Sequence, residues 1–195
     1  MMTRKEQKEK RRQDILIAAL DIFIKKGFGA TKITDIAEKV HMSNGLLFHY
    51  FPSKASLYHE LVSIGIKAMK QKIEFDHKNP LDSLQSFIEE LLNRIEEENA
   101  VAKIFVLVDQ AQYLEMIPEE TKSELAESQA FIKRTRDMIR IGQENQTIRD
   151  GDPEALSIAF WSSIQGYAQH KAQDSSCPKA EAEWFIDILR YREED

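Results

Sequence analysis

Apolar residues recur at the spacing of an α-helix along almost the whole chain, and this period constrains the fold more than any other feature. Ile15, Ala18, Ala19, Ile22 and Phe23 repeat at i, i+3, i+4, i+7 and i+8, so they share one helix face. No stretch shows the convincing apolar–polar alternation that a half-buried strand needs. The sequence therefore predicts an all-α fold.

Prolines and one glycine indicate where the helices begin and end. Pro80 follows Asn79 and Pro153 follows Asp152, which is the order of an N-cap residue and a proline in the first helical turn. Gly27 ends the first apolar repeat. We expect about nine helices, at residues 15–26, 33–40, 44–51, 54–75, 80–98, 100–116, 118–146, 153–173 and 178–192.

Charge is distributed unevenly between the two parts of the chain. Residues 1–60 hold 11 Lys and Arg against 7 Asp and Glu, a net charge of +4. Residues 61–195 hold 16 against 26, a net of −10, which together give the total of −6. A basic head on an acidic body is typical of a nucleic-acid-binding protein, although uneven composition by chance explains the charge alone equally well.

Several classes of protein do not fit the sequence. Cys177 is the only cysteine in 195 residues, so the chain has no internal disulfide and no CxxC motif. Residues 1–14 lack the apolar region of a secretory signal, and no uncharged apolar run approaches the ~20 residues of a membrane span. We therefore expect a cytoplasmic protein that binds no membrane. The spacing of the histidines also leads us to expect no metal and no cofactor.

Residues 33–51 carry the motif that indicates function. They read ITDIAEKV-HMS-NGLLFHYF, a short helix, a tight turn and a second short helix. Ser43 is a good N-cap for the second helix. In a helix-turn-helix, the second helix enters a DNA major groove ~12 Å wide while the first braces it from behind. The spacing alone is a weak signal, because helix pairs with short turns are common.

Residues 15–57 also resemble the DNA-binding head of the tetracycline-repressor (TetR) family. The matching positions, in order, are Ile15–Phe23 as I-x-x-A-A-L-x-x-F, Gly27, Ala30-Thr31, Asp35-Ile36-Ala37, Ser43, Gly45, Tyr50-Phe51, Lys54 and Leu57. A weaker resemblance resumes at residues 146–154, QTIRDGDPE. The resemblance implies a head at 1–60 and an effector-binding and dimerisation body at 61–195. It also implies a homodimeric repressor that leaves a double-stranded DNA operator when a small-molecule effector enters the body.

Three residues depart from the family's pattern. His41 stands in the turn where the family often has glycine, and histidine tolerates a positive φ better than most residues. Leu46 and Phe48 stand where threonine and tyrosine are usual. Phe48 lacks a hydroxyl that could reach a phosphate. These departures bear on single contacts and not on the fold.

The resemblance and the helix positions together nominate the residues that contact DNA. Asn44 can pair with adenine, Gly45 allows close approach and Leu46 can pack on a thymine methyl. A solvated Asn44 and a core Leu46 are the alternatives. The full set of candidate contacts is Thr31, Thr34, Asn44, Gly45, Leu46, Phe48, His49, Tyr50 and Lys54. Of these, Thr34 is equally well a helix cap, and Tyr50 a core residue.

Basic residues before the first apolar repeat form a possible DNA-binding arm. They are Arg4, Lys5, Lys8, Lys10, Arg11 and Arg12. Such an arm lies along phosphates or enters a minor groove. A frayed, solvated terminus is an equally good reading of the same residues.

Two further sets of residues belong to the body. Aromatic and neighbouring residues that can line an effector cavity, or simply form the core, are Phe105, Tyr113, Phe131, Met138, Trp161, Tyr167 and His170. The apolar faces of the last two predicted helices are expected to form a four-helix dimer interface. Its residues are Leu156, Phe160, Ile164, Tyr167, Trp184, Phe185, Ile188 and Leu189.

Other functions compete with a ligand-responsive repressor. An all-α enzyme would need a nucleophile with a base or a carboxylate–histidine metal cluster, and no such spacing occurs. A DNA-binding regulator without an effector, or an activator, stays open. If an effector acts, the helix at 54–75 is expected to carry its signal, with Gly65 as the point where that helix bends.

Overall fold

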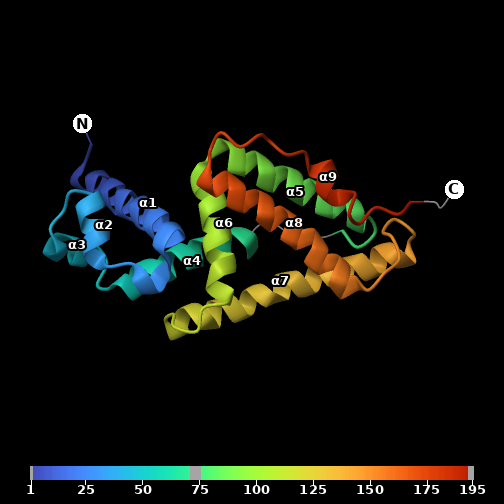
Figure 1. Ribbon diagram of the computed structural model, residues 1–195, viewed down its shortest axis with the longest axis horizontal. Helices are drawn as coiled ribbons and strands as arrows, with labels where there is room; N and C mark the ends of the chain where they lie inside the picture. The colour runs from blue at the N-terminus through green and yellow to red at the C-terminus, as the bar shows by residue number, and fades with distance from the viewer. Residues whose placement is uncertain (1, 71–75, 193–195) are drawn as a thin grey trace. The chain divides into compact units, whose positions relative to one another are not determined.

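The computed structural model describes residues 2–70 and 76–192, with the side chains of residues 70 and 127–132 also outside the description. The described residues form α-helices with turns and loops, which confirms the predicted all-α fold (Figure 1). The helices are α1 Arg4–Ala30, α2 Ile33–Lys39, α3 Asn44–Tyr50, α4 Lys54–Lys70, α5 Pro80–Glu97, α6 Asn99–Gln112, α7 Glu119–Glu144, α8 Pro153–Gln173 and α9 Ala182–Ile186. The expected end of the fourth helix at residue 75 lies outside the described residues.

The chain divides into two compact units. The first contains residues 1–66 and 103–125, and the second contains residues 67–102 and 126–195. Helices α4, α6 and α7 therefore each contribute residues to both units. The functional domain boundary predicted at residue 60 stays a prediction.

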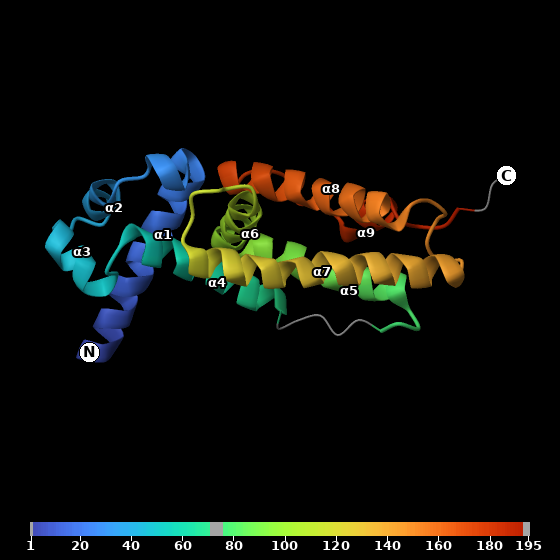
Figure 2. The same cartoon turned by 90° about the horizontal axis from the view of Figure 1, so that it is seen from below.

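In the first unit, α2 packs against both α1 and α3, and the three helices lie together in Figure 2. Ile15, Phe23, Ile36 and Leu47 are fully buried there, which is the arrangement that the helical period predicts. Gly27 interrupts α1 with φ 76° and ψ 163°, a positive-φ extended conformation that is open essentially to glycine alone.

In the second unit, α9 packs against α5 and α8. Here the predicted helix at 178–192 is wrong, because α9 ends at Ile186. The amide of Arg149 donates to the carbonyl of Leu189 (2.8 Å), and the amide of Tyr191 donates to that of Thr147 (3.1 Å). These bonds with the loop before α8 satisfy backbone groups that a longer helix would otherwise pair internally.

None of the helices in the described ranges combines the length and apolar character needed to cross a lipid bilayer.

Candidate nucleic-acid interface

Helices α2 and α3, joined by a four-residue turn, form the helix-turn-helix predicted from the sequence. Ser43 caps α3, since its Oγ accepts a hydrogen bond from the amide of Leu46 at 3.2 Å. His41 has φ 53° in the turn, so this position does need the left-handed conformation that the family often gives to glycine. Leu47 is buried and anchors α3 to the core.

The opposite face of α3 is open to solvent and is unusually apolar for an exposed helix. Leu46 is 47% exposed and Phe48 is 44% exposed, while Asn44 and His49 are also exposed. The alternative that Leu46 is a core residue is therefore wrong. These two side chains lie two positions apart on a seven-residue helix and so do not face each other, but together they leave much of its exposed surface apolar.

Gly45 lies in the first turn of this exposed face. A methyl group added at its Cα would meet no atom within 4 Å. The packing of the protein therefore gives no reason for a glycine here, although glycine costs a helix up to ~1 kcal/mol relative to alanine. Gly45 therefore stays a candidate for close approach to a DNA groove, as the sequence predicts.

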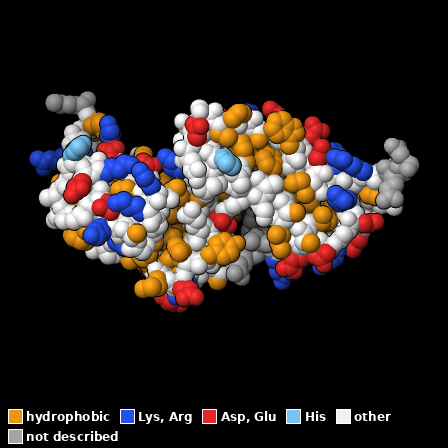
Figure 3. Space-filling model, in the orientation of Figure 1, with side chains coloured by type: hydrophobic (Ala, Val, Ile, Leu, Met, Phe, Trp, Pro, Cys, Tyr) orange, Lys and Arg blue, Asp and Glu red, His pale blue; other side chains and the backbone are white. Residues whose placement is uncertain are grey.

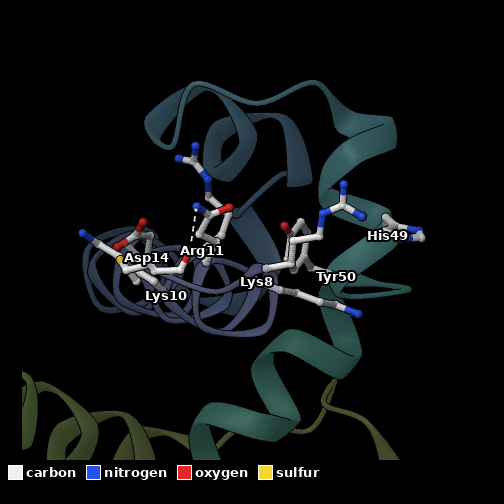
Figure 4. A pocket seen from close by; sticks show the side chains of 9 residues that line it. Lys8, Lys10, Arg11, Asp14, His49 and Tyr50 are labelled. Atoms are coloured by element: carbon white, nitrogen blue, oxygen red, sulfur yellow. Dashed lines mark hydrogen bonds between the residues drawn. The ribbon is translucent and has the colours of Figure 1, made fainter.

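A basic cleft adjoins the C-terminal end of α3. It has a volume of about 660 Å³, and its walls combine the first turns of α1 with His49 and Tyr50 (Figure 4). Basic side chains from α1 line it, namely Arg4, Lys8, Lys10 and Arg11. Lysine and arginine side chains gather over α1 to α3 on the face shown in Figure 3. Such a cleft is suited to phosphate oxygens.

The basic arm is therefore part of a helix and is not frayed. Thr3 and Glu6 close a capping box, in which the amide of Thr3 donates to the Glu6 carboxylate at 2.7 Å and the amide of Glu6 donates to Thr3 Oγ1 at 3.2 Å. Arg12 differs from the rest of the arm. Its guanidinium pairs with Glu60 and lies over the ring of Phe51, 4.9 Å from the centroid, so it ties α1 to α4.

The structure corrects the reasoning for two predicted phosphate contacts. Thr31 is only 2% exposed, and its hydroxyl donates to the carbonyl of Gly27 at 2.7 Å. The ammonium of Lys54 donates to the carbonyls of Phe28 (2.6 Å) and Thr31 (2.8 Å) and lies over the Phe28 ring. Burial lowers the pKa of Lys54. Both side chains thus cap the C-terminal end of α1, where a cation also offsets the helix dipole.

Thr34 and Tyr50 stay candidates for DNA contact. Thr34 is exposed. The side chain that accepts a hydrogen bond at the start of α2 is that of Asp35, whose carboxylate accepts from the amide of Lys32 at 3.1 Å. The alternative reading of Thr34 as a cap is therefore not supported. Tyr50 is half-buried, with its ring edge-on to His49 at 6.3 Å between centroids.

Asp21 is a residue that the sequence analysis missed. Its carboxylate accepts hydrogen bonds from Lys39 of α2 and Lys103 of α6, both at 2.7 Å. Burial works to raise the pKa of Asp21, but the hydrogen bonds from Lys103 and Lys39 outweigh it and hold the pKa below its ordinary value. One carboxylate thus joins α1, the bracing helix and α6. Nothing in the local sequence indicates pairs separated by 18 and 82 residues.

The predicted effector residues do not form one cluster. Phe105 and Tyr113 belong to the first unit, whereas the other members with described side chains belong to the second. Within the second unit, Met138 is buried, and Trp161 donates from Nε1 to Thr135 Oγ1 at 3.2 Å. The Tyr167 hydroxyl donates to Glu96 at 3.0 Å, and His170 is exposed. The side chain of Phe131 lies outside the described residues.

Several residues predicted to form the dimer interface are instead core residues of one chain. Phe160, Ile164, Phe185 and Leu189 are all buried within the second unit. Their apolar period reflects packing inside the protomer, so these four are corrected. Leu156, Tyr167 and Ile188 are half-buried, and Trp184 is exposed.

The solvent-facing side of α8 has a different composition. Ile158 is 58% exposed there, and Ala155, Ala159, Ser162 and Gly166 share its face at intervals of three or four residues. Hydrophobic side chains also interrupt the charged surface over α8 and α9 in Figure 3.

Comparison with known proteins assigns the helix-turn-helix region. Residues 15–61 match the family described as "Bacterial regulatory proteins, tetR family". The uncharacterized HTH-type transcriptional regulator YfiR of Bacillus subtilis is 32% identical over 89 residues, 45% of this chain and 43% of that protein. The HTH-type transcriptional regulator RutR of Escherichia coli is 26% identical over 167 residues, 84% of this chain and 76% of RutR. The match thus spans less than half of YfiR.

Solved structures share the fold over nearly the whole chain. The TetR-family regulator PfmR from Thermus thermophilus superposes with a TM-score of 0.66 at 22% identity, covering 92% of this chain and 99% of PfmR. AibR in complex with isovaleryl coenzyme A and operator DNA superposes with a TM-score of 0.66 at 15% identity, covering 91% and 94% of the two chains.

Proposed function

Because the chain belongs to the TetR family of bacterial transcriptional regulators, we propose that it is a ligand-responsive repressor that binds a near-palindromic operator as a homodimer. The observation that carries this proposal is the exposed face of α3. Asn44, Gly45 and Leu46 are exposed to solvent there, while the buried Leu47 anchors the helix to the core. The family is one of regulators, so the enzyme alternative has no support. A repressor acts at its operator, and the expected cytoplasmic location is part of the proposal.

The exposed residues divide into two roles on DNA. Asn44 is suited to pair with an adenine edge, and Leu46 and Phe48 are suited to thymine methyl groups. His49, Tyr50 and the basic α1 side chains of the cleft are suited to phosphates, which position the reading helix without specifying sequence. Thr34, exposed at the start of α2, is a further candidate for either role.

A homodimer needs a surface that is not used inside the protomer. We propose the exposed face of α8 for this purpose, with Trp184 as a candidate neighbour. Small residues at Ala155, Ala159 and Gly166 would let a second α8 approach closely around Ile158. The exposed apolar surface supports this assignment in place of the buried residues predicted from the sequence.

The response to an effector draws on two observations. The solved AibR complex holds isovaleryl coenzyme A together with operator DNA, which concerns that protein alone. In this chain, α4 begins directly after the helix-turn-helix and contributes residues to both units. We therefore retain α4 as the proposed carrier of the signal. A coupling free energy of ~1–3 kcal/mol per ligand between effector binding and DNA binding is typical of allosteric proteins and would suffice for regulation.

One pair of experiments tests the proposal and its alternatives. Sites selected from random DNA should be inverted repeats whose half-sites lie ~34–36 Å, about one DNA turn, apart. A promoter carrying such a site, fused to a reporter, should be silenced by the protein and released when an effector is present. Increased expression would instead favour an activator. Repression that no compound in a metabolite library relieves would favour a regulator without an effector.

A further inference from the structure

A second hollow in the first unit lies away from the reading helix and has a different character. It has a volume of about 390 Å³ and is formed by the end of α1, by α4 and by α6. One wall is aromatic, with Phe23, Phe28 and Tyr58. The other wall comes from α6 and the turn after it, and includes Leu107, Asp109 and Tyr113. Its size suits a small organic molecule.

The aromatic wall is a fixed cluster. The rings of Phe23 and Tyr58 meet edge-on at 5.0 Å between centroids, and those of Phe28 and Tyr58 lie 4.7 Å apart. Tyr58 is 1% exposed, yet its hydroxyl has no hydrogen-bond partner among the described residues. An unpaired buried hydroxyl destabilises the folded protein, because it has lost its hydrogen bonds to water and gained none in return. The hydroxyl is thus buried within the aromatic cluster, and the Tyr58 ring is what contributes to the wall of the hollow.

Asp109 supplies the complementary feature on the opposite wall. It is the one charged residue among the described residues that line the hollow. Neither a hydrogen bond nor an ion pair joins its side chain to another described residue. Burial raises the pKa of the Asp109 carboxyl, which is the result of losing water without gaining a partner.

We propose that this hollow, defined by Phe23, Phe28, Tyr58, Leu107, Asp109 and Tyr113, is a binding site for a small organic cation with an apolar body. The ammonium group of such a ligand would pair with Asp109, and its hydrocarbon or aromatic part would replace water against the rings. One molecule would thus satisfy both the carboxylate and the apolar lining of the hollow. The site lies in the first unit and is distinct from the exposed face of α3.

A charged probe and a neutral isostere of it test the proposal without DNA. The probes are 4-phenylbutylammonium and 4-phenylbutanol, which share one apolar body, and their Kd values are measured by titration calorimetry at neutral pH. The wild-type protein should bind the ammonium compound at least ~10-fold more tightly, because a hydrogen bond to a charged partner contributes more than a neutral one.

Two conservative variants assign the contacts. Asp109→Asn should weaken binding of the ammonium compound by ~10- to 100-fold and leave binding of the alcohol nearly unchanged. Tyr58→Phe should leave both affinities nearly unchanged, because the Tyr58 hydroxyl is buried and does not open into the hollow. Neither change removes an internal contact made by the altered polar group, so both proteins should fold as well as wild type. Asp150→Asn, at an exposed residue in the second unit, is the matched control and should change nothing.

Three outcomes would overturn the proposal. The first is no measurable binding of either probe at millimolar concentration. The second is equal affinity for the ammonium compound and the alcohol. The third is charge-selective binding that survives in Asp109→Asn, which would place the site elsewhere. Because no DNA is present, these outcomes are independent of whether the protein is a repressor.

Discussion

Replacing Gly65 with alanine is expected to destabilise the protein, because this glycine lies where α4 packs against α6. As a mid-helix glycine it invites substitution by alanine, which would raise helix stability by up to ~1 kcal/mol and stiffen a supposed point of bending. In the structure, a Cβ at this position would lie 2.5 Å from Val108 Cγ2 and 2.7 Å from Ile104 Cγ2, both on α6. Gly65 therefore allows α4 and α6 to pack closely, and this close packing argues against bending of α4 at Gly65.

The size of the effect follows from these distances. Ordinary van der Waals contact begins at 3.4 Å, so the distance between the alanine Cβ and Val108 Cγ2 would have to increase by about 0.9 Å. Both neighbours are β-branched and stiff at χ1, so they cannot turn away and the helices must separate. Overpacking of a tight contact costs ~1–3 kcal/mol, and two such contacts place Gly65→Ala near the upper end. After the gain in helix propensity, we expect a net loss of ~2 kcal/mol.

Urea unfolding at one fixed protein concentration measures this loss, since dimer stability depends on concentration. In a double-mutant cycle, Gly65→Ala should cost less by ~1 kcal/mol when Val108 is already alanine, because the tighter of the two clashes is gone. Gly29→Ala is the control, since its added methyl meets no atom within 4 Å. If Gly65→Ala proves as stable as wild type and uncoupled from Val108, the close-packing account of α4 and α6 is incorrect.

Four further results are expected. Asp21→Asn should lower the free energy of unfolding at pH 7. The difference in unfolding free energy from wild type should shrink as the pH falls below ~4, since a carboxylate with a lowered pKa stabilises the fold only while it is ionised. A constant difference down to pH 2 would contradict this. Lys54→Ala should cost ~1–2 kcal/mol in urea unfolding by uncapping α1, whereas exposed Lys25→Ala should not. Ile158→Glu should shift the protein from dimer to monomer in sedimentation without loss of helix content, and a persistent dimer would reject the α8 surface. Gly45→Ala should raise stability by up to ~1 kcal/mol, because its added methyl meets no atom, and should weaken DNA binding, so unaltered DNA affinity would refute close approach.

Local features of the fold could be predicted because their physics is local. The apolar period of α1, the proline that begins α8 and the cap of α3 at Ser43 each depend on residues a few positions apart. The positive φ of His41 was also foreseeable from its place in the turn.

The features that could not be predicted from the sequence depend on contacts between residues far apart along the chain. The capping of α1 by Lys54 joins residues 23 and 26 positions apart, and the early end of α9 reflects backbone pairing with residues 147–149. Apolar periodicity likewise cannot tell a residue buried in its own protomer, such as Phe160, from one that would be covered by a partner. That ambiguity produced the incorrect dimer residues.

The central claim is that α3 reads DNA sequence as part of a dimer, and selection from random duplex DNA tests it most directly. Wild-type protein should enrich an inverted repeat with half-sites about one helical turn apart. Asn44→Ala should enrich the same repeat with the preference lost at one symmetric pair of positions, and each contact removed should cost ~1–3 kcal/mol. Failure of the wild-type protein to enrich any repeat, or identical preferences in the two proteins, would contradict the account.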